Sequence, residues 1–291
     1  MCIRDSVEGD GPGPNALNSD YSAPRSITGG QGCASPRSVV SSADGTYYLG
    51  RDGILYLVTR GLQISPVGAA VQGVTALYPR CTSAVLVEAQ SQIRWTFRAT
   101  SGTSGVSVVY DYLRGQWSTF DYTLGGVATC GIEDATMWNG VYTILSQAGA
   151  VYTESTTSFL DVSAWVTLQI ESAWIVAAGL TDWQRVRRIQ TLGTYQTAHG
   201  LTVELAVNGS TSYQQTATFT EANVLVNRDI VTVHLGSQNG MNPRCKAVRF
   251  RLTDTAPATL GTGEGARFSA VGLEIVPRTG PSRHGAAGSK V

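Results

Sequence analysis

Charged residues are scarce in this sequence. They make up 14% of the 291 residues, and the formal net charge at pH 7 is zero. A dedicated nucleic-acid binder normally carries a basic face, so this balance argues against that class, although it leaves room for a basic patch inside an assembly. No window approaches the roughly 18 apolar residues that a membrane-spanning helix requires, so we expect no membrane-spanning segment.

Cysteines, histidines and the common catalytic motifs are also sparse. The five cysteines include no C-x-x-C pair, and none lies near a histidine at metal-ligand spacing. We predict buried free thiols, with disulfides or zinc as the alternatives. The isolated His199, His234 and His284 are expected to be solvated or structural. Because a G-x-S-x-G elbow, a P-loop and an H-E-x-x-H motif are all missing, we expect no enzyme activity, no cofactor and no metal.

What the sequence does contain is short strands separated by turns. Glycine is abundant, at 33 residues, and threonine, valine and serine are frequent, which is typical of an all-β protein. Asp44-Gly45 and Asp52-Gly53 predict tight hairpin turns, because glycine supplies the positive φ that such turns need. The aromatic and β-branched residues that flank these turns suit a half-buried sheet. Together they predict a small antiparallel meander.

The meander pattern recurs, with a cysteine at the start of each copy. Cys33, Cys81 and Cys130 lie 48 and 49 residues apart. The strands expected after the second and third cysteines are 84–87, 92–97, 106–112, 116–120, 135–138, 140–145 and 149–152. A period of about 40 to 50 residues is typical of β-propeller blades, and chance spacing in an ordinary all-β domain is the alternative. Three blades are fewer than the roughly four to eight that close a propeller, so we expect a partial one.

Aromatic residues recur along with the cysteines. We predict that the space between blades is filled by Trp95, Trp117 and Trp138, together with Tyr48, Tyr56, Tyr110, Tyr142 and Tyr152. A stacking site for sugar rings or bases is the alternative, although buried aromatic residues are the ordinary content of such cores.

Composition divides the chain into segments. Residues 1–6 resemble a read-through adapter rather than native sequence, so we expect an artefactual leader and a missing native N-terminus. Residues 7–32 are rich in glycine and proline and are expected to form a linker. The partial β-propeller is expected at 33–156 and a β-sandwich at 157–278. Residues 279–291 are expected to be a disordered tail.

The expected sandwich lacks the 48-residue repeat and shows alternation of apolar and polar residues instead. Such alternation predicts strands with one buried face at 166–171, 201–207, 230–235 and 247–252. Asn208-Gly209 predicts a hairpin that joins 201–207 to 213–219. About six to eight such strands predict a β-sandwich or jelly roll. The predicted fold class is therefore all-β, with a partial β-propeller of three blade-like meanders followed by a β-sandwich.

One cluster of like charges stands out, formed by Arg185, Arg187 and Arg188. It could mark a solvated strand edge, where charges discourage unwanted pairing. It could also form a salt-bridged subunit contact or a positive rim facing DNA, since the guanidinium fork suits carboxylates and phosphates. Carboxylates that would be needed for a glycosidase pair are scattered, and we expect them to cap turns or face water: Asp111, Asp121, Glu133, Asp134 and Glu171.

Several of these residues belong to a wider resemblance, which covers about residues 30 to 278. The first half contains Gly32-Cys33-x-Ser35-Pro36-Arg37-Ser38-Val39-Val40 and Val109-Tyr110-Asp111-Tyr112-x-x-Gly115-Gln116-Trp117-Ser118-Thr119-Phe120. The second half contains Trp183-Gln184-Arg185-Val186, Leu192-Gly193-x-Tyr195, Arg244-Cys245-x-x-Val248-Arg249-Phe250-Arg251-Leu252 and Gly272-Leu273-Glu274-Ile275. The chain resembles the tail nozzle proteins of short-tailed bacteriophages, also called tail tubular protein B or packaged-DNA stabilisation proteins. It departs from that pattern at 276–280, where Val-Pro-Arg-Thr-Gly replaces the expected Gly-x-Lys-x-Gly run.

The resemblance implies a structural virion protein without catalytic residues. Such proteins form a homo-oligomeric ring below the portal and adaptor, extend the DNA channel, retain packaged DNA and take part in genome ejection. The implied partners are the tail adaptor, other tail proteins and double-stranded DNA passing through the channel. The implied location is the virion tail, and the host cytoplasm during assembly. The alternatives are a carbohydrate-binding or glycan-processing β-propeller, and a kelch-like scaffold.

Overall fold

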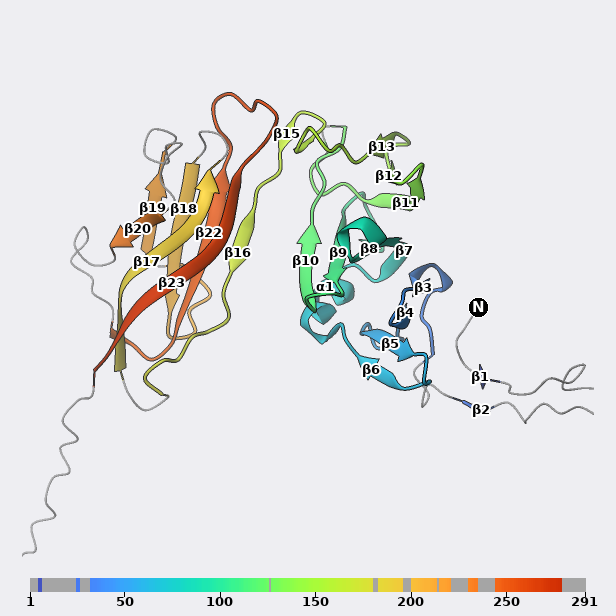
Figure 1. The fold of residues 1–291 in the computed structure, drawn as a ribbon, viewed down its shortest axis with the longest axis horizontal. Coiled ribbons are helices and arrows are strands. Elements are labelled where there is room, and N and C mark those ends of the chain that lie inside the picture. The colour runs from blue at the N-terminus through green and yellow to red at the C-terminus, as the bar shows by residue number, and fades with distance from the viewer. Residues whose placement is uncertain are drawn as a thin grey trace, which may run out of the picture. The chain divides into compact units, whose positions relative to one another are not determined.

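Regular structure in this chain is almost entirely antiparallel β-sheet. The computed structural model describes residues 5–6, 25–26, 32–125, 127–179, 183–195, 200–213, 215–220, 230–234 and 244–278. Within these ranges, helical structure is limited to α1 (Gln72–Leu77) and three 3-10 turns at Pro36–Ser38, Ala69–Val71 and Glu88–Gln90. The predicted all-β class is confirmed. The chain divides into two compact units, Met1–Thr156 and Thr157–Val291, which are described separately (Figure 1).

The first unit contains three antiparallel meanders in chain order. The first meander comprises β3 (Val40–Ser41), β4 (Gly45–Leu49), β5 (Leu55–Thr59) and β6 (Ile64–Pro66). The second meander comprises β7 (Arg80–Val87), β8 (Gln92–Arg98), β9 (Gly105–Asp111) and β10 (Gln116–Phe120). The third meander comprises β11 (Ile132–Trp138), β12 (Val141–Ser146) and β13 (Val151–Thr153). Each sheet begins close to one of the three regularly spaced cysteines, while β6 and α1 were not expected.

Two pairs of two-residue strands lie outside the larger sheets. β1 (Asp5–Ser6) pairs with β2 (Arg25–Ser26) in the stretch that the sequence assigns to the leader and linker. β14 (Leu160–Asp161) pairs with β15 (Ala164–Trp165) at the start of the second unit. The expected tail at 279–291 lies outside the described residues.

The predicted turn at Asp52-Gly53 is confirmed. Gly53 has φ +78°, a left-handed conformation that glycine adopts without steric cost. Asp52 stabilises the turn with both oxygens, because Oδ1 accepts from the Ile54 amide at 3.1 Å and Oδ2 accepts from the Tyr56 hydroxyl at 2.6 Å. This turn sets the register that places Tyr48 opposite Tyr56.

Two tyrosines of the first meander predict a loss of stability at alkaline pH. The hydrogen bond to Asp52 raises the pKa of Tyr56 to about 12, and burial raises the pKa of Tyr47 to about 12. Tyrosines in an unfolded chain ionise at about pH 10, so below that pH both residues are protonated in both states and their contribution is intact. Between about pH 10 and 12 only the unfolded chain loses these protons, so the free energy of unfolding falls.

The measurement is thermal unfolding followed by circular dichroism at a series of alkaline pH values. The melting temperature is expected to begin to fall near pH 9, where the unfolded chain loses the Cys81 proton that the folded chain keeps, and to fall more steeply above about pH 10 as the tyrosines add to this effect. In the double variant Tyr47→Phe/Tyr56→Phe the fall should be shallower, because two of the groups that cause it are gone. An equally steep fall in that variant would contradict the prediction.

The second meander packs against both of the others and presents a different face to each. Ile93, Trp95 and Phe97 on β8 pack with Tyr47 and Leu55 of the first meander in one apolar core. The alternate residues of β8 are polar. Arg98 pairs with Glu133 of the third meander, and Arg94 pairs with Glu154 in the segment that follows it. Thr96 bonds to the Thr82 hydroxyl, which also donates to the Ile132 carbonyl. Because side chains alternate along a strand, β8 presents an apolar face toward the first meander and a polar face toward the third.

The meanders are joined through their first strands. β7 contacts both β3 and β11, so strands that are distant in sequence lie side by side (Figure 1). A second core, between the second and third meanders, contains Val85 and Val87 of β7 together with Ile132, Tyr142 and Ile144. The three sheets thus form one continuous packed series, which does not close into a ring within the described residues.

Tryptophan burial follows the prediction at Trp95 and departs from it at Trp138. Trp95 is fully buried and stacks near Trp117, with 5.9 Å between the ring centroids. Trp138 is 65% exposed, so the prediction that it fills a space between blades is wrong. The reason is that the second meander covers the other face of this sheet, through Tyr142 and Ile144, and leaves the Trp138 face open.

Three of the predicted tyrosines lie between meanders, and two do not. Tyr110 packs against the core between the first two meanders, and Tyr142 and Tyr152 belong to the core between the second and third. Tyr48 and Tyr56 stack on one another, with 5.6 Å between their ring centroids, in a cluster confined to the first meander and the residues beside it. The prediction that these two lie between blades is therefore wrong. They occupy the face of the first meander that is turned away from the second.

Besides the β14–β15 pair, the described residues of the second unit form two four-stranded antiparallel sheets. One has the order β16 (Gln169–Glu171), β22 (Val248–Thr255), β18 (Gly200–Val207) and β19 (Gln215–Phe219). In the other, β17 (Trp183–Tyr195) pairs with β20 (Ile230–His234), β21 (Arg244–Cys245) and β23 (Ala266–Arg278). Buried residues from both sheets form a single core, which includes Val186, Ile189, Val203, Phe250 and Leu252.

The strand predictions for this unit hold in part. β18, β20 and β22 lie where alternation predicts them, and the hairpin at Asn208-Gly209 is confirmed by positive φ at both residues, +54° and +78°. The strand expected at 166–171 is shorter, because only Gln169–Glu171 pairs and Val166 is 46% exposed. The alternation predicts neither of the two longest strands, β17 and β23, and the arginine cluster alone indicates a strand edge at β17. Register shifts between them interrupt the alternation and hide its period of two.

Candidate functional site

The three arginines singled out by the sequence lie on β17. Val186 is fully buried, and so is Ile189 three residues further on. A strictly alternating strand could not bury both on one face, but the pairing with β23 shifts by one residue between Val186 and Arg188. This bulge leaves Arg187 and Arg188 together on the outward face. The adjacent Arg-Arg pair thus becomes compatible with a strand that has one buried face.

The expectation of a strand edge is wrong for this segment. β17 pairs with β23 along one side and with β20 and β21 along the other, so it is an interior strand. Charges at this position do not protect an open edge, and the arginines project from the face of the sheet instead. Arg187 is exposed, whereas Arg185 and Arg188 are half-buried. The prediction that they contact DNA or another subunit stays a prediction.

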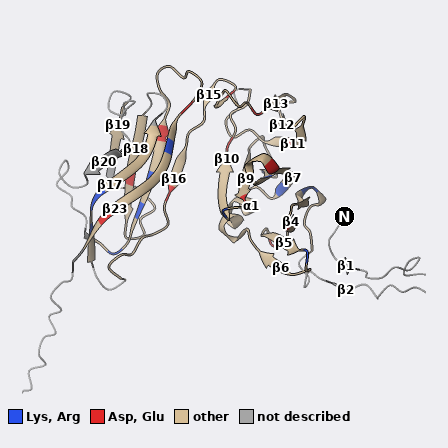
Figure 2. Ribbon diagram, in the orientation of Figure 1, with Lys and Arg blue, Asp and Glu red and all other residues tan. Residues whose placement is uncertain are grey.

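The described outward face of β17 and β23 is predominantly basic. Among the described residues of β17 and β23 it carries one glutamate, Glu274, which forms an ion pair with Nε of Arg188. The arginines on the same face are Arg185, Arg187, Arg188 and Arg267. Figure 2 shows the charged positions on the strands of this unit. These two strands therefore carry a local excess of positive charge on a chain with no formal net charge.

The other sheet of the second unit carries a stack of arginines and aromatic rings that sequence reasoning missed. The Arg249 guanidinium lies 5.1 Å from the Trp174 ring centre and 5.2 Å from that of Tyr213. The Arg251 guanidinium lies 4.0 Å from the same Tyr213 ring centre. Carboxylates complete the stack, because Glu171 pairs with Arg249 at 2.6 Å and Glu204 with Arg251 at 2.5 Å.

This stack stabilises the surface of the sheet. The hydrogen bond to Glu204 raises the pKa of Arg251, so the guanidinium stays charged. Cation–π contacts at partly exposed sites are worth about 0.5–1 kcal/mol each. The alternation of Arg249 and Arg251 is visible in the sequence. The partners Trp174 and Tyr213 are not, because they come from segments far away along the chain.

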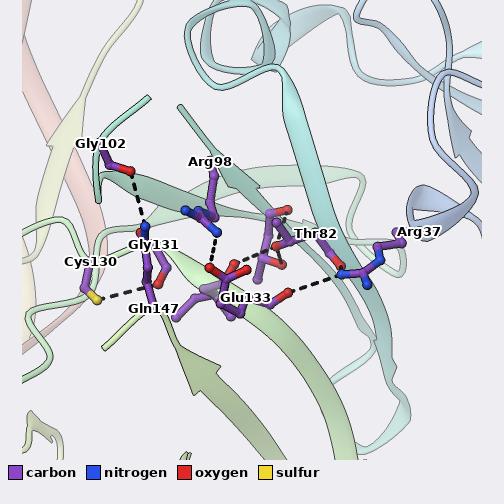
Figure 3. A network of polar contacts seen from close by, with 10 residues as sticks. Arg37, Thr82, Arg98, Gly102, Cys130, Gly131, Glu133 and Gln147 are labelled. Carbon is purple, nitrogen blue, oxygen red and sulfur yellow. Dashed lines mark hydrogen bonds and ion pairs between the residues drawn. The ribbon is translucent and has the colours of Figure 1, made fainter. Parts of the chain in front are cut away.

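A network of polar contacts connects segments of all three meanders in the first unit (Figure 3). Arg98 of β8, only 6% exposed, forms an ion pair with Glu133 of β11. Thr82 of β7 donates its hydroxyl to the Ile132 carbonyl at 2.7 Å. Arg37, which precedes β3, donates to the carbonyls of Thr82 at 3.3 Å and Glu133 at 3.5 Å. The sheets are thus held by directional bonds as well as by apolar packing.

A second ion pair ties the segment after β13 to the second meander. Arg94 is 3% exposed and donates to both carboxylate oxygens of Glu154, at 3.3 and 3.2 Å. Its guanidinium also lies 4.6 Å from the Tyr142 ring centre and 5.7 Å from that of Phe120. A buried guanidinium needs such partners, because removal from water is costly for an unpaired charge.

The described cysteines behave as the sequence predicts. Cys33, Cys81, Cys130 and Cys245 are buried free thiols, and the fifth cysteine lies outside the described residues. Burial raises the pKa of the Cys81 thiol to about 12, so it is unreactive at neutral pH. The described part of the chain contains no group of three or more His, Cys, Asp or Glu side chains that could hold a metal ion. The side chains of all three histidines lie outside the described set.

The scattered carboxylates fall into two groups. Asp111 closes a turn by accepting from the amide and the guanidinium of Arg114, and these bonds lower its pKa. Asp121 and Asp134 are exposed, so the expectation that these residues cap turns or face water holds for all three aspartates. Glu133 is half-buried and Glu171 is exposed, and each forms an ion pair with an arginine.

Comparison with known proteins gives no family assignment. No family model matches the chain, and no curated protein matches it. Among solved structures, it is similar to a glycoside hydrolase family 43 arabinoxylan arabinofuranohydrolase from Bacillus subtilis in complex with cellotetraose, with TM-score 0.22 and 8% identity. It is also similar to the insecticidal delta-endotoxin Cry8Ea1 from Bacillus thuringiensis, with TM-score 0.25 and 10% identity, and to another glycoside hydrolase, with TM-score 0.22 and 10% identity.

These likenesses extend over most of this chain but not over the whole of the other proteins. The matches cover 81%, 82% and 81% of this chain, and 66%, 51% and 69% of the three structures in the same order. At these TM-scores they carry no argument about fold or function. In the part of the chain that the structure describes, no helix is both long enough and apolar enough to cross a membrane.

Proposed function

We propose that this chain is a structural virion protein of a phage tail ring, or nozzle, which extends the DNA channel, retains packaged DNA and takes part in genome ejection. In this proposal the three meanders are consecutive blades of a partial β-propeller, and the two-sheet unit is a β-sandwich. The ring is homo-oligomeric and contacts the tail adaptor, other tail proteins and double-stranded DNA.

The observation that carries the proposal is the packing of the first unit. Its sheets are stacked in chain order and bonded to one another through Arg37, Thr82 and Glu133. Directional bonds between packed sheets favour a rigid body over a hinged one. A wall around passing DNA needs this rigidity, and the nozzle resemblance in the sequence points to the same role. The basic face of β17 and β23 supplies a surface suited to phosphates.

Electron microscopy and mass photometry of the purified chain test the proposal. We expect discrete oligomers of one copy number, seen as rings with a central opening that admits double-stranded DNA. Symmetric closure predicts a single dominant mass rather than a ladder of sizes. Monomers alone across the accessible concentration range, or hydrolysis of a polysaccharide by the purified chain, would count against it.

The arginines of β17 predict salt-dependent binding to double-stranded DNA. Each phosphate contact releases counterions, so removal of one arginine should lower the slope of log affinity against log salt by about 1. The variant Arg187→Gln removes the exposed member of the cluster and leaves the Arg188–Glu274 pair in place. Fluorescence anisotropy with a labelled duplex at several salt concentrations measures the slope.

The matched control is Arg60→Gln, which removes an exposed arginine from the first unit. This change should leave the salt dependence close to that of the unmodified chain. Equal slopes for the unmodified chain and Arg187→Gln would rule out a DNA contact at this residue.

A further inference from the structure

The third meander has one face that no other described part of the first unit covers. Four large apolar side chains are exposed on it: Trp138 at 65%, Val141 at 39%, Leu145 at 37% and Val151 at 66%. The strand register places Trp138 opposite Val141, and Leu145 opposite Val151. The row between these pairs contains Thr136, Thr143 and Thr153. We name these seven residues the open face.

The open face differs from a normal solvated sheet surface. A sheet with one face in water usually carries polar and charged residues on that face. Here β12 and β13 contain no charged residue, and Asp134 is the one charge on this side of the three strands. Contiguous exposed apolar surface of this kind marks interaction sites.

The open face continues a series of sheet interfaces. The first meander is covered by the second through Tyr47, Leu55 and Trp95, and the second is covered by the third through Val85 and Ile144. In each step one sheet lies against the next, as sheets stacked about 10 Å apart do. The third meander repeats this arrangement but is the last of the series, so its forward face lacks the sheet that the other two have.

We propose that the open face docks against a second copy of this chain. This inference rests on the proposed ring, which brings copies side by side, and it names one surface through which they meet. The low charge fits that occupant, because Asp134 is the one charge beside the open face and no acidic or basic partner surface is needed to match it. The interface between the second and third meanders, by contrast, includes ion pairs of Arg94 with Glu154 and of Arg98 with Glu133 as well as apolar contacts.

The small size of the open face predicts a reversible contact. Stable interfaces involve about 20–30 residues per partner, whereas the open face has seven. The open face by itself should therefore support association that depends on protein concentration, and other contacts would complete a stable ring.

The test is sedimentation velocity of the full chain across a range of concentrations, with and without Trp138→Lys/Val151→Lys. Both positions are well exposed, so the charges should disturb docking and leave folding intact, which the melting temperature checks. We expect the dissociation constant to rise at least about tenfold. The control Leu113→Lys places a charge at an exposed apolar residue off the open face, because Leu113 is 73% exposed. The control chain should associate with the same dissociation constant as the unmodified chain.

A labelling measurement separates this surface from other modes of assembly. Thr143→Cys introduces a thiol at the centre of the open face, while the described native thiols are buried, and the unmodified chain serves as the blank. Its reaction with a maleimide should slow when the chain is assembled and recover on dilution. Assembly that survives the double lysine variant, with Thr143→Cys still fully reactive, would overturn the inference and leave the ring proposal standing. A chain that stays monomeric at every concentration would overturn both.

Discussion

Replacing Trp95 with alanine is expected to lower the free energy of unfolding by about 3–5 kcal/mol, as the loss of a large buried aromatic residue does. Trp95 is completely inaccessible to solvent. Its ring meets Tyr47 edge-on at 6.0 Å and Trp117 in a stacked arrangement at 5.9 Å. Its Nε1–H donates to the Ser38 carbonyl at 3.0 Å. The residue therefore joins the first and second meanders both by packing and by a hydrogen bond.

Two further variants separate the contributions at this position. Trp95→Phe keeps an aromatic ring but loses the bond to Ser38 and part of the volume, so a smaller loss of about 2 kcal/mol is expected. Trp138→Ala changes the same residue type at an exposed site and should alter stability by no more than about 0.5 kcal/mol. Urea unfolding followed by circular dichroism measures all three. If Trp95→Ala and Trp138→Ala had similar effects, the assigned packing between the first two meanders would be wrong.

Replacing Glu133 with glutamine is expected to cost about 1–3 kcal/mol, because Arg98 would keep a buried charge without its partner. Breaking a fully buried pair costs about 3–5 kcal/mol. Here the Arg98 side chain is 8% exposed but that of Glu133 is 40% exposed, so water screens the pair and the lower range applies. The backbone carbonyls of Glu133 and Ile132 still accept hydrogen bonds from Arg37 and Thr82 in the variant, because these bonds do not involve the Glu133 side chain.

A double-mutant cycle isolates the ion pair. Arg98→Met removes the charge and keeps an unbranched apolar side chain, and the double variant Arg98→Met/Glu133→Gln contains no unpaired charge. We expect the double variant to be less destabilised than the sum of the single variants. Asp111→Asn is the matched control, because it alters a surface pair whose arginine, Arg114, is 63% exposed, and it should cost clearly less stability than Glu133→Gln. Strict additivity in the cycle would show that Arg98 and Glu133 do not interact.

Tight turns and the repeat of the meanders could be predicted from the sequence alone. Asp52-Gly53 forms a hairpin through the left-handed conformation of the glycine and the hydrogen bonds of the aspartate, all within a few residues. The spacing of Cys33, Cys81 and Cys130 located three meanders, because each repeat carries its own turns. Asn208-Gly209 set the β18–β19 hairpin in the same way. These features depend on neighbours along the chain, so a single sequence is enough to predict them.

Tertiary structure alone decided which strand faces are covered. Trp95 and Trp138 are the same residue type in similar strands, yet one is fully buried and the other 65% exposed. Burial depends on whether another sheet lies against that face, and the sequence of one repeat does not contain this information. The same limit applies to Arg94 and Arg98, whose carboxylate partners lie 60 and 35 residues away. It applies also to β17, which is an interior strand because three distant segments pair with it.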